Sequence, residues 1–353
     1  MPASLARNVK TRLLPLLSDT KFNSTTPQRF TNSETLYNPT LKDTITTLRS
    51  YLNLDKILNF QVPDIPVETM CSQAVSAETR DCVYRLGHSS VLMKVDKLSI
   101  LTDPVLGNRA SPLEWAGPKR YHHLPISVSD LPFIDVCLIS HDHYDHLDKQ
   151  TIKQLHSKVG AFLVPKCVAS HLIEWGVPDD KIVEFDWWQS MVVSGVRFAF
   201  APTQHFSGRS FKQRDSSLWG SWAILGQGSK IYFSGDSGYF DGFKQIGERY
   251  GPFDLTLMET GAYDENWADI HMFPEQSVQA HLDVQGAVML PIHNTTFDLS
   301  FHVWNDPLLR AEKEAKRLGV DFLCPKIGEK VLLSELEVSN QERWWEEEKA
   351  HNV

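Results

Sequence analysis

Residues 140–148 read Ser140-His141-Asp142-His143-Tyr144-Asp145-His146-Leu147-Asp148. The run Asp135-Val136-Cys137-Leu138-Ile139 precedes them and is typical of a strand buried on both faces. A helical stretch follows at 149–158, so the histidine-rich segment is expected to be a loop at the C-terminal end of a strand. Ligands commonly bind at that end of a sheet. The pattern therefore favours a functional loop over a polar surface turn.

The side chains of this loop are of the types that bind metal ions. Residues two apart in an extended or turning loop point the same way, so His141 and His143 can hold one ion. Asp145 and His146 then turn toward a neighbouring ion. A surface residue without a ligand is the usual interpretation of a single histidine, but this packed set after a buried strand disfavours it. One loop is therefore predicted to serve two metal ions.

Further candidate ligands follow predicted strands later in the chain. His205 follows the strand at 196–201, Asp236 follows 230–233 and His293 follows 287–292. Each alone could be a cap or a turn residue, so the prediction depends on all of them meeting the loop. The first ion is assigned His141, His143 and His205; the second is assigned Asp145, His146 and His293; Asp236 is the bridging carboxylate.

This ligand set predicts both the cofactors and the reaction class. Imidazole and carboxylate ligands without thiolate suit two zinc ions, and also iron or manganese. The set leaves room for a water, which loses its proton close to neutral pH when two cations share it. Such a water is a nucleophile, so the sequence predicts a hydrolase that acts on a phosphoryl or carbonyl centre.

Predicted strands and helices alternate twice along the chain. Strands are expected at 82–86, 91–95, 98–101, 135–139, 161–164, 196–201, 222–225, 230–233, 255–258 and 287–292. Helices are expected at 149–158, 169–175, 239–249, 274–284 and 307–318. This order predicts two packed sheets with helices outside, of class α/β (α+β). Residues 71–340 are assigned to that domain, 1–70 to an N-terminal arm with a helix near 41–58, and 341–353 to a charged C-terminal tail.

Composition excludes several classes of protein. The net charge of −9 provides no general excess of lysine and arginine, so no nucleic acid partner is expected. Apolar runs are too short to span a bilayer, and the five scattered cysteines fit a reducing compartment, which favours a cytoplasmic location. The basic, interrupted apolar segment at 1–17 is either a surface arm or a peripheral membrane contact. The sequence is also compatible with a homodimer.

The segment 141–146 also resembles a known signature, HxHxDH, of the metallo-β-lactamase superfamily. The order His205, Asp236, His293 after the loop is similar to the order in that family. The resemblance implies a four-layer αββα sandwich, with a dinuclear metal site at the edge of the two sheets.

A narrower resemblance, over residues 80–330, is to the N-acylphosphatidylethanolamine-hydrolysing phospholipase D group and its bacterial relatives. The similar stretches include Gly87-His88-Ser89-Ser90-Val91-Leu92, Leu101-Thr102-Asp103-Pro104, Gly117-Pro118-Lys119-Arg120 and Gly261-Ala262-Tyr263. This resemblance implies a phospholipid substrate, N-acylphosphatidylethanolamine, which is cut to phosphatidic acid and a fatty-acid ethanolamide.

The same resemblance implies roles for residues outside the ligand set. Asp103 matches an acidic residue that supports the site, and His271 matches a histidine near the substrate phosphate. Together with Asp145 they are the predicted catalytic residues. A turn before Pro104 is the alternative for Asp103, and a surface loop is the alternative for His271. His88 is expected to brace the metal loop rather than to bind an ion.

The substrate has rival interpretations. This sequence departs from the phospholipase at Met258-Glu259-Thr260 and at Asn294-Thr295-Thr296, and the N-terminal arm shows no clear likeness. A lactone or a soluble phosphodiester would need the same metals, and a non-catalytic metal- or lipid-binding protein is a third reading. An apolar channel beside the metals would favour the lipid. Tryptophans that could line such a channel, or simply form core, are Trp115, Trp187, Trp188, Trp219 and Trp222.

Overall fold

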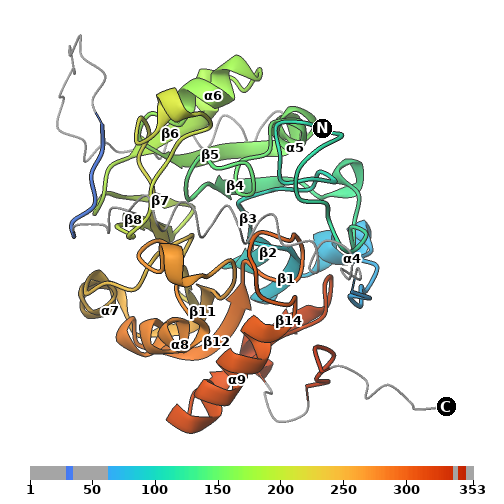
Figure 1. Cartoon of the computed structure of the whole chain (residues 1–353). Coiled ribbons are helices and arrows are strands. Elements are labelled where there is room, and N and C mark those ends of the chain that lie inside the picture. Colours follow the sequence, from blue (N-terminus) through green and yellow to red (C-terminus); the bar gives the residue numbers. More distant parts are fainter. Residues whose placement is uncertain (1–28, 35–62, 337–340, 347–353) are drawn as a thin grey trace.

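Two seven-stranded sheets lie face to face at the centre of the molecule (Figure 1). The computed structural model describes residues 29–34, 63–336 and 341–346. Apolar side chains from both sheets, such as Val91 and Ile100 from one and Phe198 and Trp222 from the other, form the core between them. The central prediction, two packed sheets, is therefore confirmed.

The first sheet has the strand order β14-β1-β2-β3-β4-β5-β6. Its strands are β1 (Cys82–Gly87), β2 (Ser90–Val95), β3 (Leu98–Thr102), β4 (Ile134–Leu138), β5 (Val159–Pro165), β6 (Ile182–Phe185) and β14 (Lys330–Leu332). Strands β1 to β3 are an antiparallel meander, and β3 to β6 pair in parallel. Because β3 and β4 are parallel, the chain leaves both of them at the same edge of the sheet.

The second sheet has the order β13-β12-β11-β10-β9-β8-β7. Its strands are β7 (Ser190–Val193), β8 (Val196–Ala201), β9 (Ser221–Leu225), β10 (Lys230–Phe233), β11 (Phe253–Glu259), β12 (Gly286–Ile292) and β13 (Asp321–Phe322). Strands β7 to β10 are antiparallel, and β10 to β13 are parallel. The carboxyl ends of β10, β11 and β12 therefore lie side by side.

Helices cover the outer face of each sheet, which completes the four layers of the predicted αββα sandwich (Figure 1). The first sheet is covered by α4 (Ser72–Ala77), α5 (Lys149–Leu155) and α6 (Ala169–Glu174). The second is covered by α7 (Gly242–Tyr250), α8 (Pro274–Asp283) and α9 (Asp306–Leu318). Among the described residues, no helix combines the length and the apolarity needed to cross a bilayer.

The chain segments outside the predicted domain also contact it where the structure describes them. Phe30, from the segment 1–70, packs against the core between the sheets. In the segment predicted as a charged tail, Trp345 is buried beside Phe322, and Asn305 donates its side-chain N–H to the Trp345 carbonyl at 3.0 Å. Residues 341–346 therefore belong to the packed structure. The predicted helix near 41–58 and the segment at 1–17 lie outside the described residues.

Substituting Trp345→Ala is expected to lower the free energy of unfolding by about 3–5 kcal/mol, because the side chain is fully buried and its removal leaves a cavity. Chemical denaturation of the full chain measures this change. The matched control is Trp115→Ala, at a tryptophan that is 78% exposed, where the change should stay within about 0.5 kcal/mol. Equal effects of the two substitutions would contradict the packing of residues 341–346.

Candidate metal centre

Three imidazoles converge at the end of the sandwich where the loop after β4 meets the end of β8. His141 Nε2 lies 2.9 Å from His143 Nδ1, and His205 Nε2 lies 3.2 Å from the same His143 atom. The three ring nitrogens lie within 4.8 Å of one another. This spacing allows three nitrogen lone pairs to point at one cation, as in zinc sites with three histidines. The structure thus brings together the ligands predicted for the first ion.

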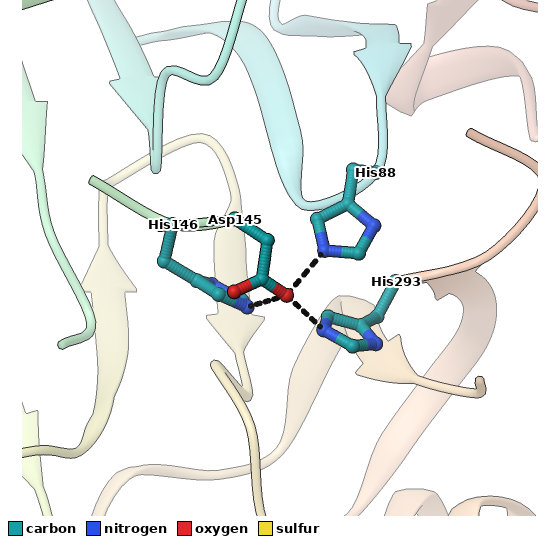
Figure 2. A group of neighbouring side chains, drawn as sticks. All are labelled: His88, Asp145, His146 and His293. Atoms are coloured by element: carbon teal, nitrogen blue, oxygen red, sulfur yellow. Dashed lines mark hydrogen bonds and ion pairs between the residues drawn. The ribbon is translucent and has the colours of Figure 1, made fainter. Parts of the chain in front are cut away.

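A second group surrounds the carboxylate of Asp145 (Figure 2). Asp145 Oδ2 lies 3.2 Å from His293 Nε2 and 3.5 Å from His146 Nε2. His88, in the turn between β1 and β2, places its Nε2 3.1 Å from the same oxygen. The ligands predicted for the second ion therefore meet, and His88 joins them. Its contact with Asp145 fits the predicted bracing role, and its ring nitrogen is close enough to bind an ion itself.

The carboxylate of Asp236 lies between the two groups. Its Oδ2 is 3.1 Å from His146 Nε2 and 3.2 Å from His293 Nε2. The same oxygen is 3.8 Å from His141 Nε2 and 3.8 Å from His205 Nε2. Asp236 follows β10. The preceding residue, Gly235, has φ +57°, and an added Cβ there would lie 2.7 Å from the Gly220 carbonyl oxygen, so glycine allows the chain to turn at this point. This is the position expected of a bridging carboxylate.

The chemistry of the cluster fits bound cations. His146 Nε2 and Asp236 Oδ1 are buried, and neither makes a hydrogen bond of good geometry within the described ranges, although His146 Nε2 lies 3.1 Å from Asp236 Oδ2. Buried polar atoms are normally paired, so such a concentration of unpaired atoms calls for a ligand. Imidazole nitrogens and carboxylate oxygens without a thiolate are the donor set of zinc, iron and manganese. The residues present therefore fit the predicted metal ions, whose identity and number are part of the proposal below.

Burial favours the metal-binding form of the first group. It lowers the pKa of His141, His143 and His205, because an imidazolium ion loses its hydration in the interior. Neutral imidazole is the form that coordinates a metal. No proton has to be removed from these rings at neutral pH before an ion binds.

The second group shows the opposite balance of forces. Burial lowers the pKa of His146 and His293 as well, but the negative charges of Asp236 and Asp145 outweigh it. The pKa of His293 is raised to about 10, and that of His146 is raised well above its ordinary value. The same attraction holds the pKa of Asp236 well below its ordinary range, although burial opposes it. A cation that binds here replaces protons, so its affinity is expected to rise with pH.

Asp103, a predicted catalytic residue, lies behind His146. Its Oδ2 accepts hydrogen bonds from Ser140 Oγ at 2.5 Å and contacts His146 Nδ1 at 2.7 Å, and its Oδ1 accepts from the Ser140 N–H at 2.7 Å. The carboxylate is fully buried. This geometry orients the His146 ring and turns its Nε2 toward the cluster. Asp103 is therefore placed to support a candidate ligand rather than to contact a substrate directly.

His205 is held by Asn32, a residue of the predicted N-terminal arm, to which the sequence assigned no candidate site residue. The Asn32 side chain donates to the His205 carbonyl at 2.7 Å and accepts from the His205 N–H at 3.0 Å. The ring itself is held through Nδ1, which lies 2.9 Å from the Ile270 carbonyl oxygen. These contacts fix both the backbone and the ring of a candidate ligand. The sequence does not predict this contact, because a side chain that hydrogen-bonds a distant backbone produces no local pattern.

Several residues of the site have left-handed backbone conformations. His88, Asp103 and His293 have φ values of +52°, +32° and +62°. Such a conformation costs a non-glycine residue about 1–3 kcal/mol, so neighbouring contacts must hold it. The His293 N–H donates to the His88 carbonyl at 3.1 Å, and the buried Arg85 donates to the Asn294 side-chain oxygen at 2.6 Å. The loops that carry the cluster are thus fixed by contacts with each other.

A pocket of about 260 Å³ opens beside the cluster. It is lined by His143, Asp145, Phe206, Asp236, Ala262, Trp267, Ile270, His271, His293 and Leu299. His271, the other predicted catalytic residue outside the ligand set, thus lines the pocket, where its Nδ1 contacts Glu259 Oε1. None of the five tryptophans named from the sequence lines this pocket; Trp267 does. No role was predicted for Glu259 from the sequence, although it is the last residue of β11 and the candidate ligands likewise lie shortly after strand ends.

Comparison with known proteins agrees with this geometry. A family model described as Beta-lactamase superfamily domain matches residues 99–294. An uncharacterized protein of Mycobacterium tuberculosis is 46% identical over 257 residues, which cover 72% of this chain and 69% of that protein. The N-acyl-phosphatidylethanolamine-hydrolyzing phospholipase D 1 of Caenorhabditis elegans is 34% identical over 248 residues, which cover 67% of this chain and 69% of that protein.

Solved structures agree on the fold. Igni18, a metallo hydrolase from Ignicoccus hospitalis, has a TM-score of 0.56 and 22% identity, and the match covers 72% of this chain and 98% of Igni18. The four-layer fold and the histidine–aspartate cluster define the class of a metal-dependent hydrolase. The chain belongs to the metallo-β-lactamase superfamily.

Substituting Asp103→Asn is expected to weaken metal binding about 10- to 100-fold, since the neutral amide no longer provides a charged acceptor behind His146. Competition with a chromophoric chelator, on protein loaded with zinc, measures the affinity. The matched control is Asp179→Asn, at an exposed aspartate, which should bind metal as the unmodified protein does. Unchanged affinity in Asp103→Asn would show that this carboxylate does not support the centre.

Proposed function

We propose that this protein is a phosphodiesterase of the phospholipase D type, which holds two zinc ions and releases an N-acylethanolamine and phosphatidic acid from N-acylphosphatidylethanolamine. The observation that carries the proposal is the division of the pocket into two kinds of surface. Its polar part, the floor, consists of the candidate ligands His143, Asp145, Asp236 and His293, and its apolar part, the wall, consists of Phe206, Trp267, Ile270 and Leu299. A phosphodiester bound to the floor would place the groups attached to it against that wall.

The names of two relatives support this choice of substrate. Besides the nematode protein, the mitochondrial N-acyl-phosphatidylethanolamine-hydrolyzing phospholipase D of Saccharomyces cerevisiae is 31% identical over 255 residues, covering 69% of this chain and 54% of that protein. At these identities the chemistry of the site is more readily shared than the choice of lipid. The substrate panel below therefore compares an N-acylated phospholipid with a plain phospholipid and with non-lipid substrates.

The candidate ligands would hold the ions in two sets, with Asp236 common to both. His141, His143 and His205 form one set, and Asp145, His146 and His293 the other. Bound zinc supplies a water of lowered pKa and positive charge to offset that of the phosphoryl oxygens. Overall, the water oxygen joins phosphorus, the bond from phosphorus to the ethanolamide oxygen breaks, and a proton passes to that leaving oxygen.

The remaining residues of the site position what reacts. Asp103 holds the His146 ring through Nδ1, and Asn32 holds the backbone of His205. His271 lines the pocket beside the cluster, where its ring can hydrogen-bond an oxygen of the substrate. Trp267 is fixed by a hydrogen bond from Nε1 to the Ala262 carbonyl oxygen at 2.7 Å and presents a rigid apolar surface to the pocket. Orientation by fixed side chains lowers the entropy cost of reaching the transition state.

Purified protein is expected to contain about two zinc ions per chain and to hydrolyse N-acylphosphatidylethanolamine. Elemental analysis measures the metal. A panel of one N-acylated phospholipid, one plain phospholipid, one lactone and one aryl phosphodiester tests the substrate. Preference for the lactone would show that the protein catalyses a different reaction. Activity only on the aryl phosphodiester would support a phosphodiesterase but contradict the lipid substrate. No turnover on any member of the panel would overturn the proposal.

The variants His143→Ala and Asp236→Asn are expected to lose more than ~100-fold in turnover while staying folded, since each removes a candidate ligand rather than a supporting residue. Circular dichroism checks the fold and elemental analysis checks the metal. The matched controls are His123→Ala and Asp179→Asn, both at exposed positions. Retained turnover in the first pair would refute the assignment of the site.

Replacing Trp267 by alanine is expected to raise KM about tenfold for a diacyl N-acylated substrate dispersed in detergent, as apolar contact with the pocket wall is lost. An aryl phosphodiester serves as the control substrate, and its kcat should change little. Steady-state kinetics on both substrates provides the comparison. An equal loss on both would mean that Trp267 shapes the centre itself rather than the apolar wall.

A further inference from the structure

We propose that Glu259 is a positioning residue that fixes the ring of His271 through Nδ1 and so leaves Nε2 to contact the substrate in the pocket. The inference deepens the proposed function, because the substrate is the one named there. It concerns a position where the sequence departs from the phospholipase group, so it addresses a feature of this chain in particular.

The Glu259 carboxylate is buried and held on both oxygens. Its side chain has no exposed surface, Oε1 contacts His271 Nδ1, and Oε2 accepts a hydrogen bond from the Ser237 N–H at 2.8 Å. The backbone is fixed as well, because the Glu259 N–H donates to Ser234 Oγ at 2.9 Å and the Glu259 carbonyl accepts from Ser277 Oγ at 2.6 Å. The carboxylate therefore cannot follow His271 if the ring moves; the ring must adapt to the carboxylate.

This carboxylate has one ionisable partner. Among the described residues, Glu259 forms an ion pair with His271 alone, and no lysine or arginine contacts it. Burying a carboxyl group is costly unless its partners are well placed. An apolar residue at the end of β11 would avoid this cost. The acid at this position thus points to a task that involves the imidazole.

His271 has its other ring nitrogen left for the pocket. Nδ1 is taken up by Glu259, while Nε2 has no hydrogen bond among the described residues, and the side chain lines the pocket. The ring also packs against His293 and His205, with centroid distances of 5.4 and 5.1 Å. Whichever atom of the Glu259–His271 pair carries the shared proton, Nδ1 is occupied. The remaining nitrogen is then held next to the candidate metal ligands, where a substrate oxygen would lie.

Two other roles for Glu259 make different predictions. Its carboxylate belongs to a group with Asp236, His271 and His293 whose candidate ligand atoms lie within 4.8 Å of one another, so it could bind a metal ion itself. It could also serve only to close the end of β11. Loss of bound metal on substitution is expected from the first alternative, and loss of stability without a specific kinetic effect from the second. The positioning role predicts that neither happens and that the effect disappears when His271 is absent.

The test is a double-mutant cycle on zinc-loaded, full-length protein, with Glu259→Ala, Glu259→Gln, His271→Ala and the double variant Glu259→Ala/His271→Ala. We expect Glu259→Ala to lower kcat/KM about 10- to 100-fold with metal content unchanged. The double variant should be no slower than His271→Ala alone, because the two residues act as one unit. Glu259→Gln should recover part of the loss, since its side-chain amide can still hydrogen-bond Nδ1. The matched control is Glu248→Ala, at an exposed glutamate.

Three results would overturn the inference: additive losses in the double variant, metal released from Glu259→Ala, or unchanged kinetics in Glu259→Ala. A readout without turnover separates this from failure of the proposed function. In ¹⁵N-histidine-labelled, zinc-loaded protein, the proton shared between Glu259 and His271 Nδ1 should give a downfield resonance that disappears in both His271→Ala and Glu259→Ala. If no substrate of the panel reacts but this resonance behaves as expected, the proposed function fails and the Glu259–His271 contact stands. A resonance that persists in Glu259→Ala refutes the contact itself.

Discussion

The site depends on a carboxylate oxygen, Oδ2 of Asp236, that lies within 4 Å of imidazoles from both candidate metal sets. Buried imidazoles resist protonation, and buried carboxylates resist ionisation, so neither group would be stable in the interior alone. Their mutual attraction allows both to be buried. It also sets the protonation of His146 and His293, which in turn determines what a cation has to displace. Much of the surrounding structure can be understood as holding this arrangement in place.

The two surfaces of the pocket come from different parts of the fold. The floor is built from candidate ligands in the loops after β4, β10 and β12, so its position is set by the packing of the two sheets. The apolar wall includes other loop residues such as Trp267 and Leu299. Loops can change without disturbing the core. A family built on this fold can therefore keep one metal centre and vary the substrate through its loops.

The sequence predicted the layers and the cluster because both depend on short-range patterns. Buried strands such as β4 and β12 are mostly apolar, and the candidate ligands follow them within a few residues. Strands β6, β7, β13 and β14 were not predicted, since β6 and β7 are partly exposed and the other two are only two and three residues long. Asn32, Glu259 and Trp345 were missed for another reason. Their roles arise from contacts across the fold, and the residue types alone do not distinguish them from ordinary polar or core residues.

The contact between Asn32 and His205 ties together two regions that are 173 positions apart in the chain. Because the amide satisfies both backbone groups of His205, a chain shortened past this asparagine would leave an N–H and a carbonyl without those partners directly behind a candidate ligand. A fragment that keeps these two hydrogen bonds must therefore begin at or before Asn32, well before the regular sheet begins at Cys82. Anyone trimming this protein to its recognisable family segment would keep the metal-binding signature and discard part of what steadies it.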